Sequence, residues 1–144
     1  MYLVDTDVIS AGALARRLAS AGLIAWMERN SDQLFLSVIS VAELEQGIAK
    51  TRRRDAGRRA AALEDWLETL LHLYGRRVLP FDVAAARIAG RLSDRARSRG
   101  HTPGFPDLAI AATAVAHDLI VLTRNLRHFV PLDVPALDPF EALP

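Results

Sequence analysis

The first ten residues, MYLVDTDVIS (1–10), place acidic side chains directly after a short apolar run. A strand that is buried on both faces shows as such a run, and YLV (2–4) fits this pattern. Asp5 and Asp7 follow immediately. In open α/β sheets, ligands bind beyond the carboxyl ends of the strands. Asp5 is therefore either a helix cap or part of a functional site, and evidence from the rest of the sequence is needed to distinguish these two roles.

The remainder of the chain alternates strand-like and helical patterns. Apolar runs predict further strands at 34–37, 77–80 and 119–123, and three- and four-residue apolar spacing predicts helices over 59–74, 82–99 and 106–117. This alternation favours a parallel sheet covered by helices on both faces. The tail VPLDVPALDPFEALP (130–144) is rich in proline, so we expect at most one short edge strand there. No linker or repeat divides the chain, and we expect one domain over 1–144.

Composition excludes several classes of protein. The 144 residues include no cysteine, so disulfides and thiolate metal sites are ruled out. The N-terminus lacks the pattern of a signal peptide, and no apolar run approaches the roughly 18 residues of a membrane span. We therefore expect a cytoplasmic protein with no membrane association. The net charge of +1 does not indicate a nucleic-acid binder, but it leaves room for a local basic patch.

Two polar residues follow predicted strands and two lie near the starts of predicted helices: Asp5 and Asn125, and Glu43 and Asp107. Asp5 or Asp7 could cap the following turn, Ser40 and Glu43 could form a capping box, and Asp107 could favour the positive end of a helix dipole. Residues that follow parallel strands emerge at one edge of the sheet. We expect a helix that leads into a strand to start at the opposite edge of the sheet. Asp107 therefore lies near the other polar residues only if the start of its helix reaches their edge.

Four segments carry a family resemblance. LVDTDVIS (3–10), SVISVAELEQGIA (37–49), PDLAIAATAVAHDLIVLTRN (106–125) and HF (128–129) resemble the PIN-domain ribonucleases, specifically the VapC and FitB-like toxins of type II toxin–antitoxin pairs. The match runs in order along nearly the whole chain. It implies a three-layer α/β/α PIN-like domain with a parallel sheet of about five strands.

The resemblance also implies a site and its partners. Asp5 and Asp107 would hold Mg²⁺ or Mn²⁺, Glu43 would assist directly or through water, and Asn125 would complete the catalytic set. Clustered carboxylates repel one another without a compensating cation, and Mg²⁺ prefers oxygen ligands while it keeps positions for a substrate phosphate. The implied activity is metal-dependent hydrolysis of RNA that leaves a 5′-phosphate and a 3′-hydroxyl. The implied partners are RNA, an antitoxin with a DNA-binding domain, and a second copy of the chain.

One position departs from the family pattern. Many members carry Asp where this chain has Asn125, and an amide offers an acceptor oxygen without a charge. The change argues against a second metal ion more than it argues against catalysis. Asp7, where many relatives carry Asn, is a candidate to take its place in space.

The basic run, the histidines and one glycine-containing loop each allow more than one interpretation. KTRRRDAGRR (50–59) is the densest basic run; we expect a solvated loop, which could follow RNA phosphates or contact an antitoxin. The histidines, at 72, 101, 117 and 128, lack zinc-site spacing, and we expect them at the surface or at helix ends. The loop GHTPG (100–104) is expected to border the substrate entry beside Asp107.

Two alternatives come from other classes. A strand followed by Asp-x-Asp also opens the haloacid-dehalogenase-type phosphatases, but that chemistry needs a late Lys, and the only Lys here is Lys50. The second alternative is a PIN-like binding protein that acts only within a complex of antitoxin and DNA. Cleavage of RNA that requires Mg²⁺ and stops with a chelator would separate these readings.

Overall fold

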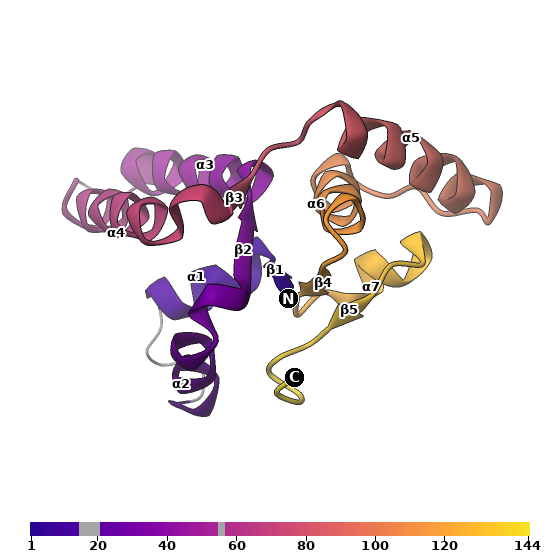
Figure 1. The fold of residues 1–144 in the computed structure, drawn as a ribbon. Helices are drawn as coiled ribbons and strands as arrows, with labels where there is room; N and C mark the ends of the chain where they lie inside the picture. Colours follow the sequence, from indigo (N-terminus) through magenta and orange to yellow (C-terminus); the bar gives the residue numbers. More distant parts are fainter. Residues whose placement is uncertain (15–20, 55–56) are drawn as a thin grey trace.

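The computed structural model describes residues 1–14, 21–54 and 57–144. Within them, a parallel sheet has the strand order β3-β2-β1-β4-β5 (Figure 1). The strands are β1 (Tyr2–Val4), β2 (Leu34–Ser37), β3 (Val78–Leu79), β4 (Ile120–Leu122) and β5 (Ala136–Leu137). The expected five parallel strands are confirmed.

Alternation along the strands divides the core into two layers. Leu3 pairs in register with Phe35 and Val121, and these side chains pack in one apolar cluster with helices of the C-terminal half. Val4 pairs with Leu122, and both pack in a second cluster on the opposite face. Successive side chains of a strand point to opposite faces, so one short apolar run supplies both clusters.

Helices cover both faces of the sheet. The second cluster lies under α1 (Thr6–Leu14), α2 (Ala21–Arg29), α3 (Val38–Arg54) and α4 (Arg58–Tyr74). The first lies under α5 (Val83–Ser98), α6 (Phe105–Ala116) and the short α7 (Leu126–Phe129). Figure 1 shows these two groups on either side of the strands. The arrangement confirms the expected three layers.

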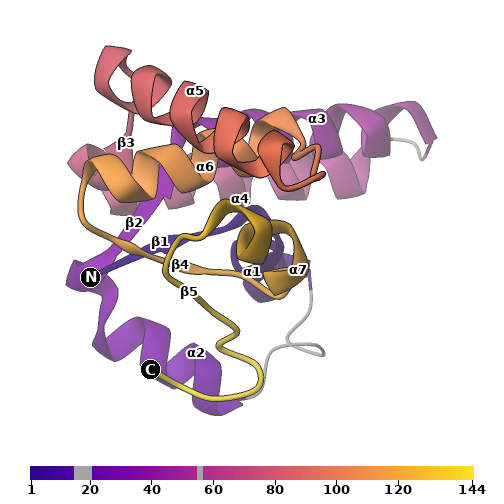
Figure 2. The same ribbon diagram turned by 90° about the vertical axis from the view of Figure 1, so that its right-hand side faces the viewer.

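The predicted element ranges agree with the structure to within one or two residues. Helix α5 is capped at its start by Asp82, whose Oδ1 accepts a hydrogen bond from the Ala85 amide at 2.9 Å. The proline-rich tail adds the edge strand β5 and then runs towards α2 (Figure 2), where Phe140 packs against the second cluster. None of the described helices is long and apolar enough to span a membrane.

The basic run at 50–59 differs from expectation. Residues 50–54 form the last turns of α3, α4 begins at Arg58, and residues 55–56 lie outside the described residues. The expected loop assumed that these cations stood near a helix start. Arg52–Arg54 instead occupy a helix C-terminus, where positive charge interacts favourably with the helix dipole.

Candidate active site

A hollow of about 360 Å³ lies at the carboxyl edge of β1 and β4. Its lining residues come from the end of β1 and from α1, from α3, from the start of α6, from the turn after β4 and from α7: Asp5, Thr6, Asp7, Ser10, Glu43, Pro106, Asp107, Asn125 and His128. All four residues singled out in the sequence therefore line one hollow. We call it the acidic hollow.

Asp107 reaches the acidic hollow directly, and the expectation that its helix would start at the opposite edge is wrong. Helix α6 leads into β4 through a short turn, in which the Leu119 amide donates to the Ala114 carbonyl at 2.9 Å. A helix between parallel strands runs antiparallel to them, so its end lies beside the start of β4 and its start lies beside the carboxyl edge. The ordinary geometry of the fold therefore places Asp107 with the other acids.

Asp5 is the most deeply buried acid of the site. It is only 6% exposed, its Oδ1 accepts from the Thr6 amide at 2.7 Å, and its Oδ2 accepts from the Thr123 hydroxyl at 2.7 Å. Burial raises the pKa of Asp5 to about 7; the charges of Asp7 and Glu43 add to the rise, and the hydrogen bonds from the two threonines partly oppose it. A compensating positive charge in the hollow would favour the ionised form.

Glu43 does not form the capping box that its spacing suggested. Helix α3 begins at Val38, and the Ser37 hydroxyl accepts from the Ile39 amide at 3.1 Å, so Ser40 lies inside the helix. The Glu43 Oε2 instead accepts from the Thr6 hydroxyl at 2.5 Å. Thr6 thus donates its amide to Asp5 and its hydroxyl to Glu43, and it links two of the predicted site carboxylates.

Asp7 and Asn125 are hydrogen-bonded to each other. Asp7 Oδ2 accepts from the Asn125 Nδ2 at 2.9 Å and from the Arg124 amide at 3.1 Å. Its Oδ1 is buried and has no hydrogen-bond partner among the described residues, and burial raises the pKa of this carboxyl. Asp7 therefore lies beside Asn125 in the acidic hollow.

His128 is a site residue that the sequence reasoning missed. It was expected at the surface or at a helix end, and it does lie in α7, but its Nδ1 lies 3.2 Å from Asp107 Oδ2. The spacing Asn125-x-x-His128 was the available signal, because residues three apart lie on the same side of a helical turn. The missing information was the contact with α6.

The donors of the acidic hollow suit a hard divalent cation. Mg²⁺ and Mn²⁺ take oxygen ligands, and the hollow offers the carboxylates of Asp5, Glu43 and Asp107. In the described part of the chain, no three Asp, Glu or His side chains lie close enough together to form a ready-made cage. A cation would have to draw these oxygens together.

Comparison with known proteins places this site in a family. Residues 2–132 match the PIN domain family. The chain is 36% identical to VapC ribonuclease Y4jK of Sinorhizobium fredii, with 98% of this chain and 99% of the relative covered. It is 34% identical to toxin FitB of Neisseria gonorrhoeae, with 97% and 99% covered.

A solved structure agrees with these relatives. The structure of FitAB bound to a DNA fragment matches with a TM-score of 0.85 and 32% identity, over 97% of this chain and 96% of that chain. The fold, the full-length match and the sequence identity all lead to one assignment. The chain belongs to the PIN domain family, among its VapC and FitB-like toxins.

Proposed function

We propose that this protein is a metal-dependent endoribonuclease and the toxin of a type II toxin–antitoxin pair. The observation that supports the proposal most is the convergence of Asp5, Glu43 and Asp107 on one hollow, where Asp5 is buried and both of its hydrogen-bond donors are neutral. Such an arrangement stores repulsion between carboxylates, which a bound cation relieves.

Asp5 and Asp107 would hold Mg²⁺ or Mn²⁺, with Glu43 acting directly or through water. When bound, such a cation polarises a phosphodiester, lowers the pKa of a bound water and stabilises the leaving oxygen. Membership of the PIN family and the names of the relatives favour a nuclease over a phosphatase. The only lysine, Lys50, lies on α3 rather than late in the fold.

The surrounding side chains hold the acids in place. The Thr6 amide and the Thr123 hydroxyl fix the orientation of the Asp5 carboxylate. The Thr6 hydroxyl orients Glu43, and His128 orients Asp107. Partners of this kind are positioning residues, because they act on the ligand carboxylates and not on the substrate.

The proposed reaction is hydrolysis by in-line attack of water on phosphorus. The water oxygen bonds to phosphorus, the bond from phosphorus to the 3′ oxygen breaks, and the 3′ oxygen gains a proton. The products carry a 5′-phosphate and a 3′-hydroxyl. The ribose 2′-hydroxyl is not the nucleophile in this reaction, so no 2′,3′-cyclic phosphate should accumulate.

The partners follow from the same family. FitAB was solved bound to DNA, and FitB is named a toxin. We therefore propose RNA as substrate, an antitoxin with a DNA-binding domain as the protein partner, and a homodimer as the assembly.

Cleavage of RNA by the purified chain tests the activity. With Mg²⁺ the parent should cut single-stranded RNA, and EDTA should stop the reaction. Asp5→Asn and Asp107→Asn should abolish cleavage, whereas Asp65→Asn, at an exposed position on α4, should cut as the parent does. End analysis should show 5′-phosphates.

Two outcomes would contradict the proposal. Retention of full activity by both site variants would remove Asp5 and Asp107 from the active site. A folded parent that cuts no RNA in Mg²⁺ or Mn²⁺, yet binds its antitoxin and DNA, would favour the alternative of a PIN-like binding protein.

A further inference from the structure

A second hollow, of about 420 Å³, adjoins the acidic hollow. It lies between the loop that joins α5 to α6, the start of α6, and α7 with the turn that follows it. Its polar lining consists of His101, Thr102, Asp107, Arg127 and His128. We call it the Arg127 hollow.

The two hollows share a wall. Asp107 and His128 line both of them, and the contact between Asp107 Oδ2 and His128 Nδ1, at 3.2 Å, forms that wall. A chain-like ligand whose reacting group lies in the acidic hollow can therefore extend into the Arg127 hollow. The loop 100–104 was expected to border the substrate entry, and residues 101–104 line this second hollow.

The Arg127 hollow contains a cationic side chain, which the acidic hollow lacks. Its lining includes one guanidinium and two imidazoles, against the single carboxylate of Asp107. The side chains of Arg127 and His101 have no hydrogen-bond or ion-pair partner within the described ranges. A nearby acid, Asp133, already pairs with Arg95 at 3.5 Å.

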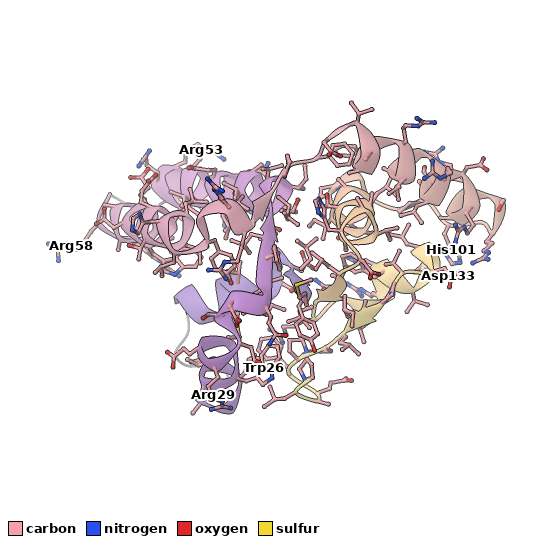
Figure 3. The ribbon with its side chains drawn as sticks, in the orientation of Figure 1. Trp26, Arg29, Arg53, Arg58, His101 and Asp133 are labelled. Atoms are coloured by element: carbon pink, nitrogen blue, oxygen red, sulfur yellow. The ribbon has the colours of Figure 1, made fainter. Side chains whose placement is uncertain are left out.

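Figure 3 shows that His101 and Asp133 lie on the side of α5 and α6, away from the labelled arginines of α2, α3 and α4. His101, which lines the Arg127 hollow, therefore lies apart from the basic run at the end of α3. Any anionic ligand held by Arg127 approaches the acidic hollow from the α6 side.

Size and chemistry indicate the ligand. Ligand pockets are commonly 300–1,000 Å³, and this one is large enough for part of a nucleotide. An arginine binds phosphate through paired N–H donors. Pro103 and Pro131 give the hollow flat apolar surfaces next to those donors.

We propose that the Arg127 hollow binds the nucleotide next to the scissile phosphodiester, with Arg127 contacting the phosphate of that nucleotide and His101 contributing a second donor. This inference rests on the proposed ribonuclease function. RNA is favoured over an acidic segment of a protein partner, because the hollow shares Asp107 and His128 with the hydrolytic site and a flanking phosphate must lie close to the scissile one.

RNA binding by Arg127→Gln tests the proposal. Binding of a single-stranded RNA oligonucleotide is measured in the Asp5→Asn background, which should bind without cutting, over a range of salt concentrations. Arg127→Gln should weaken binding about tenfold, as expected for loss of a charged hydrogen bond. It should also reduce the slope of log K against log salt by about 0.7. His101→Gln should weaken binding to a smaller extent.

The matched control is Arg29→Gln, at an exposed arginine at the end of α2, which should leave both the affinity and the slope unchanged. In the cleaving protein, Arg127→Gln should lower kcat/KM and Arg29→Gln should not. Thermal melts of every variant check that the fold is intact.

The outcomes separate this proposal from the proposed function. If the parent cuts RNA but Arg127→Gln binds and cuts it like Arg29→Gln, the Arg127 hollow is not an RNA subsite and the ribonuclease assignment stands. Unchanged RNA binding with weakened binding of the antitoxin would assign the hollow to the protein partner. A folded parent that neither binds nor cuts RNA would overturn both proposals.

Discussion

Asp5 lies at the end of the central strand with both carboxylate oxygens hydrogen-bonded to neutral donors. Its pKa, about 7 against an ordinary value of 3.8, means that the folded protein holds this proton more tightly than the unfolded chain does. Between these two pH values the folded state binds more protons, so the free energy of unfolding of the metal-free protein falls as the pH rises. The full loss of stability caused by ionised Asp5 is present above the pKa of Asp5 in the folded protein.

The stability of the metal-free protein should therefore depend on pH through Asp5. Between pH 5 and pH 8, in EDTA, the parent should lose about 3 kcal/mol of unfolding free energy through this group, at about 1.4 kcal/mol for each pKa unit. Asp5→Asn should lack this contribution. Urea denaturation of both proteins at the two pH values measures the difference, and parallel pH profiles would contradict the assignment.

Thr6 connects the Asp5 and Glu43 carboxylates, so its hydroxyl should matter for the orientation of Glu43. Thr6→Val keeps the side-chain shape and the amide that donates to Asp5, and removes only the donor to Glu43. We expect activity or Mg²⁺ affinity to fall about 10- to 100-fold. Thr51→Val, whose hydroxyl donates only to the Gly47 carbonyl in α3, is the control. Equal activity in the two variants would show that Glu43 needs no such orientation.

At the scale of elements, α3 contains a glycine that the fold does not need. Gly47 lies in the helix interior, and a Cβ added there would meet no atom within 4 Å; the same holds for Gly90 in α5. Gly47→Ala and Gly90→Ala should each raise the free energy of unfolding by about 0.5–1 kcal/mol. Gly47 also lines hollows that share Glu43 with the acidic hollow.

Urea denaturation measures the two stabilities, and RNA cleavage measures function. If a ligand passes close to α3, only Gly47→Ala should reduce cleavage, since Gly90 lies on α5 and lines none of the hollows at the acidic site. A loss of stability at either position would show that the added methyl group is not accommodated.

The basic side chains at the end of α3 differ in their surroundings. Arg52 forms an ion pair with Glu64 of α4, whereas Lys50 and Arg53 line a hollow of about 530 Å³ that includes Glu43. If this surface follows RNA phosphates, Arg53→Gln should reduce the salt slope of RNA binding by about 0.7, and Arg52→Gln should change it less.

Fluorescence anisotropy over a salt series compares these two variants. An unchanged slope for Arg53→Gln, together with weaker binding of the antitoxin, would assign this end of α3 to the protein partner. Equal reductions in the two variants would show that the pair with Glu64 does not withhold Arg52 from RNA.

At the scale of the whole molecule, the proposed metal site would couple metal binding to folding. A ligand that binds only the folded state stabilises it, so excess Mg²⁺ should raise the Tm of the parent more than that of Asp5→Asn or Asp107→Asn. In EDTA these variants should be as stable as the parent or more stable, because each removes a charge from a crowded group of carboxylates.

Melting curves in EDTA and in excess Mg²⁺ measure both effects. If the two acids were only helix caps, each variant should instead lose stability in both buffers, by about 0.5–2 kcal/mol for a cap replaced by Ala. That result, with no response of the parent to Mg²⁺, would return Asp5 and Asp107 to a purely structural role.

The sequence by itself determined the elements and the family. Apolar runs at 2–4, 34–37 and 119–123 predicted the three central strands, and the spacing within 59–74 and 82–99 predicted α4 and α5. These features are local, because the apolar periodicity of a strand or a helix depends only on residues that are close in the sequence. The family resemblance, which the comparisons confirm, supplied Asp5, Glu43 and Asp107 as candidates.

Only the tertiary structure decided which side chains meet. The Thr6 hydroxyl reaches Glu43 across 37 positions of sequence, and Thr123 reaches Asp5 across 118. Spacing suggested a capping box for Glu43 and a surface position for His128, and packing of α3 against α1 and of α7 against α6 gave each a different partner. Local patterns determine the periodicity of an element, whereas contacts between distant residues depend on how the elements pack, which no short stretch of sequence encodes.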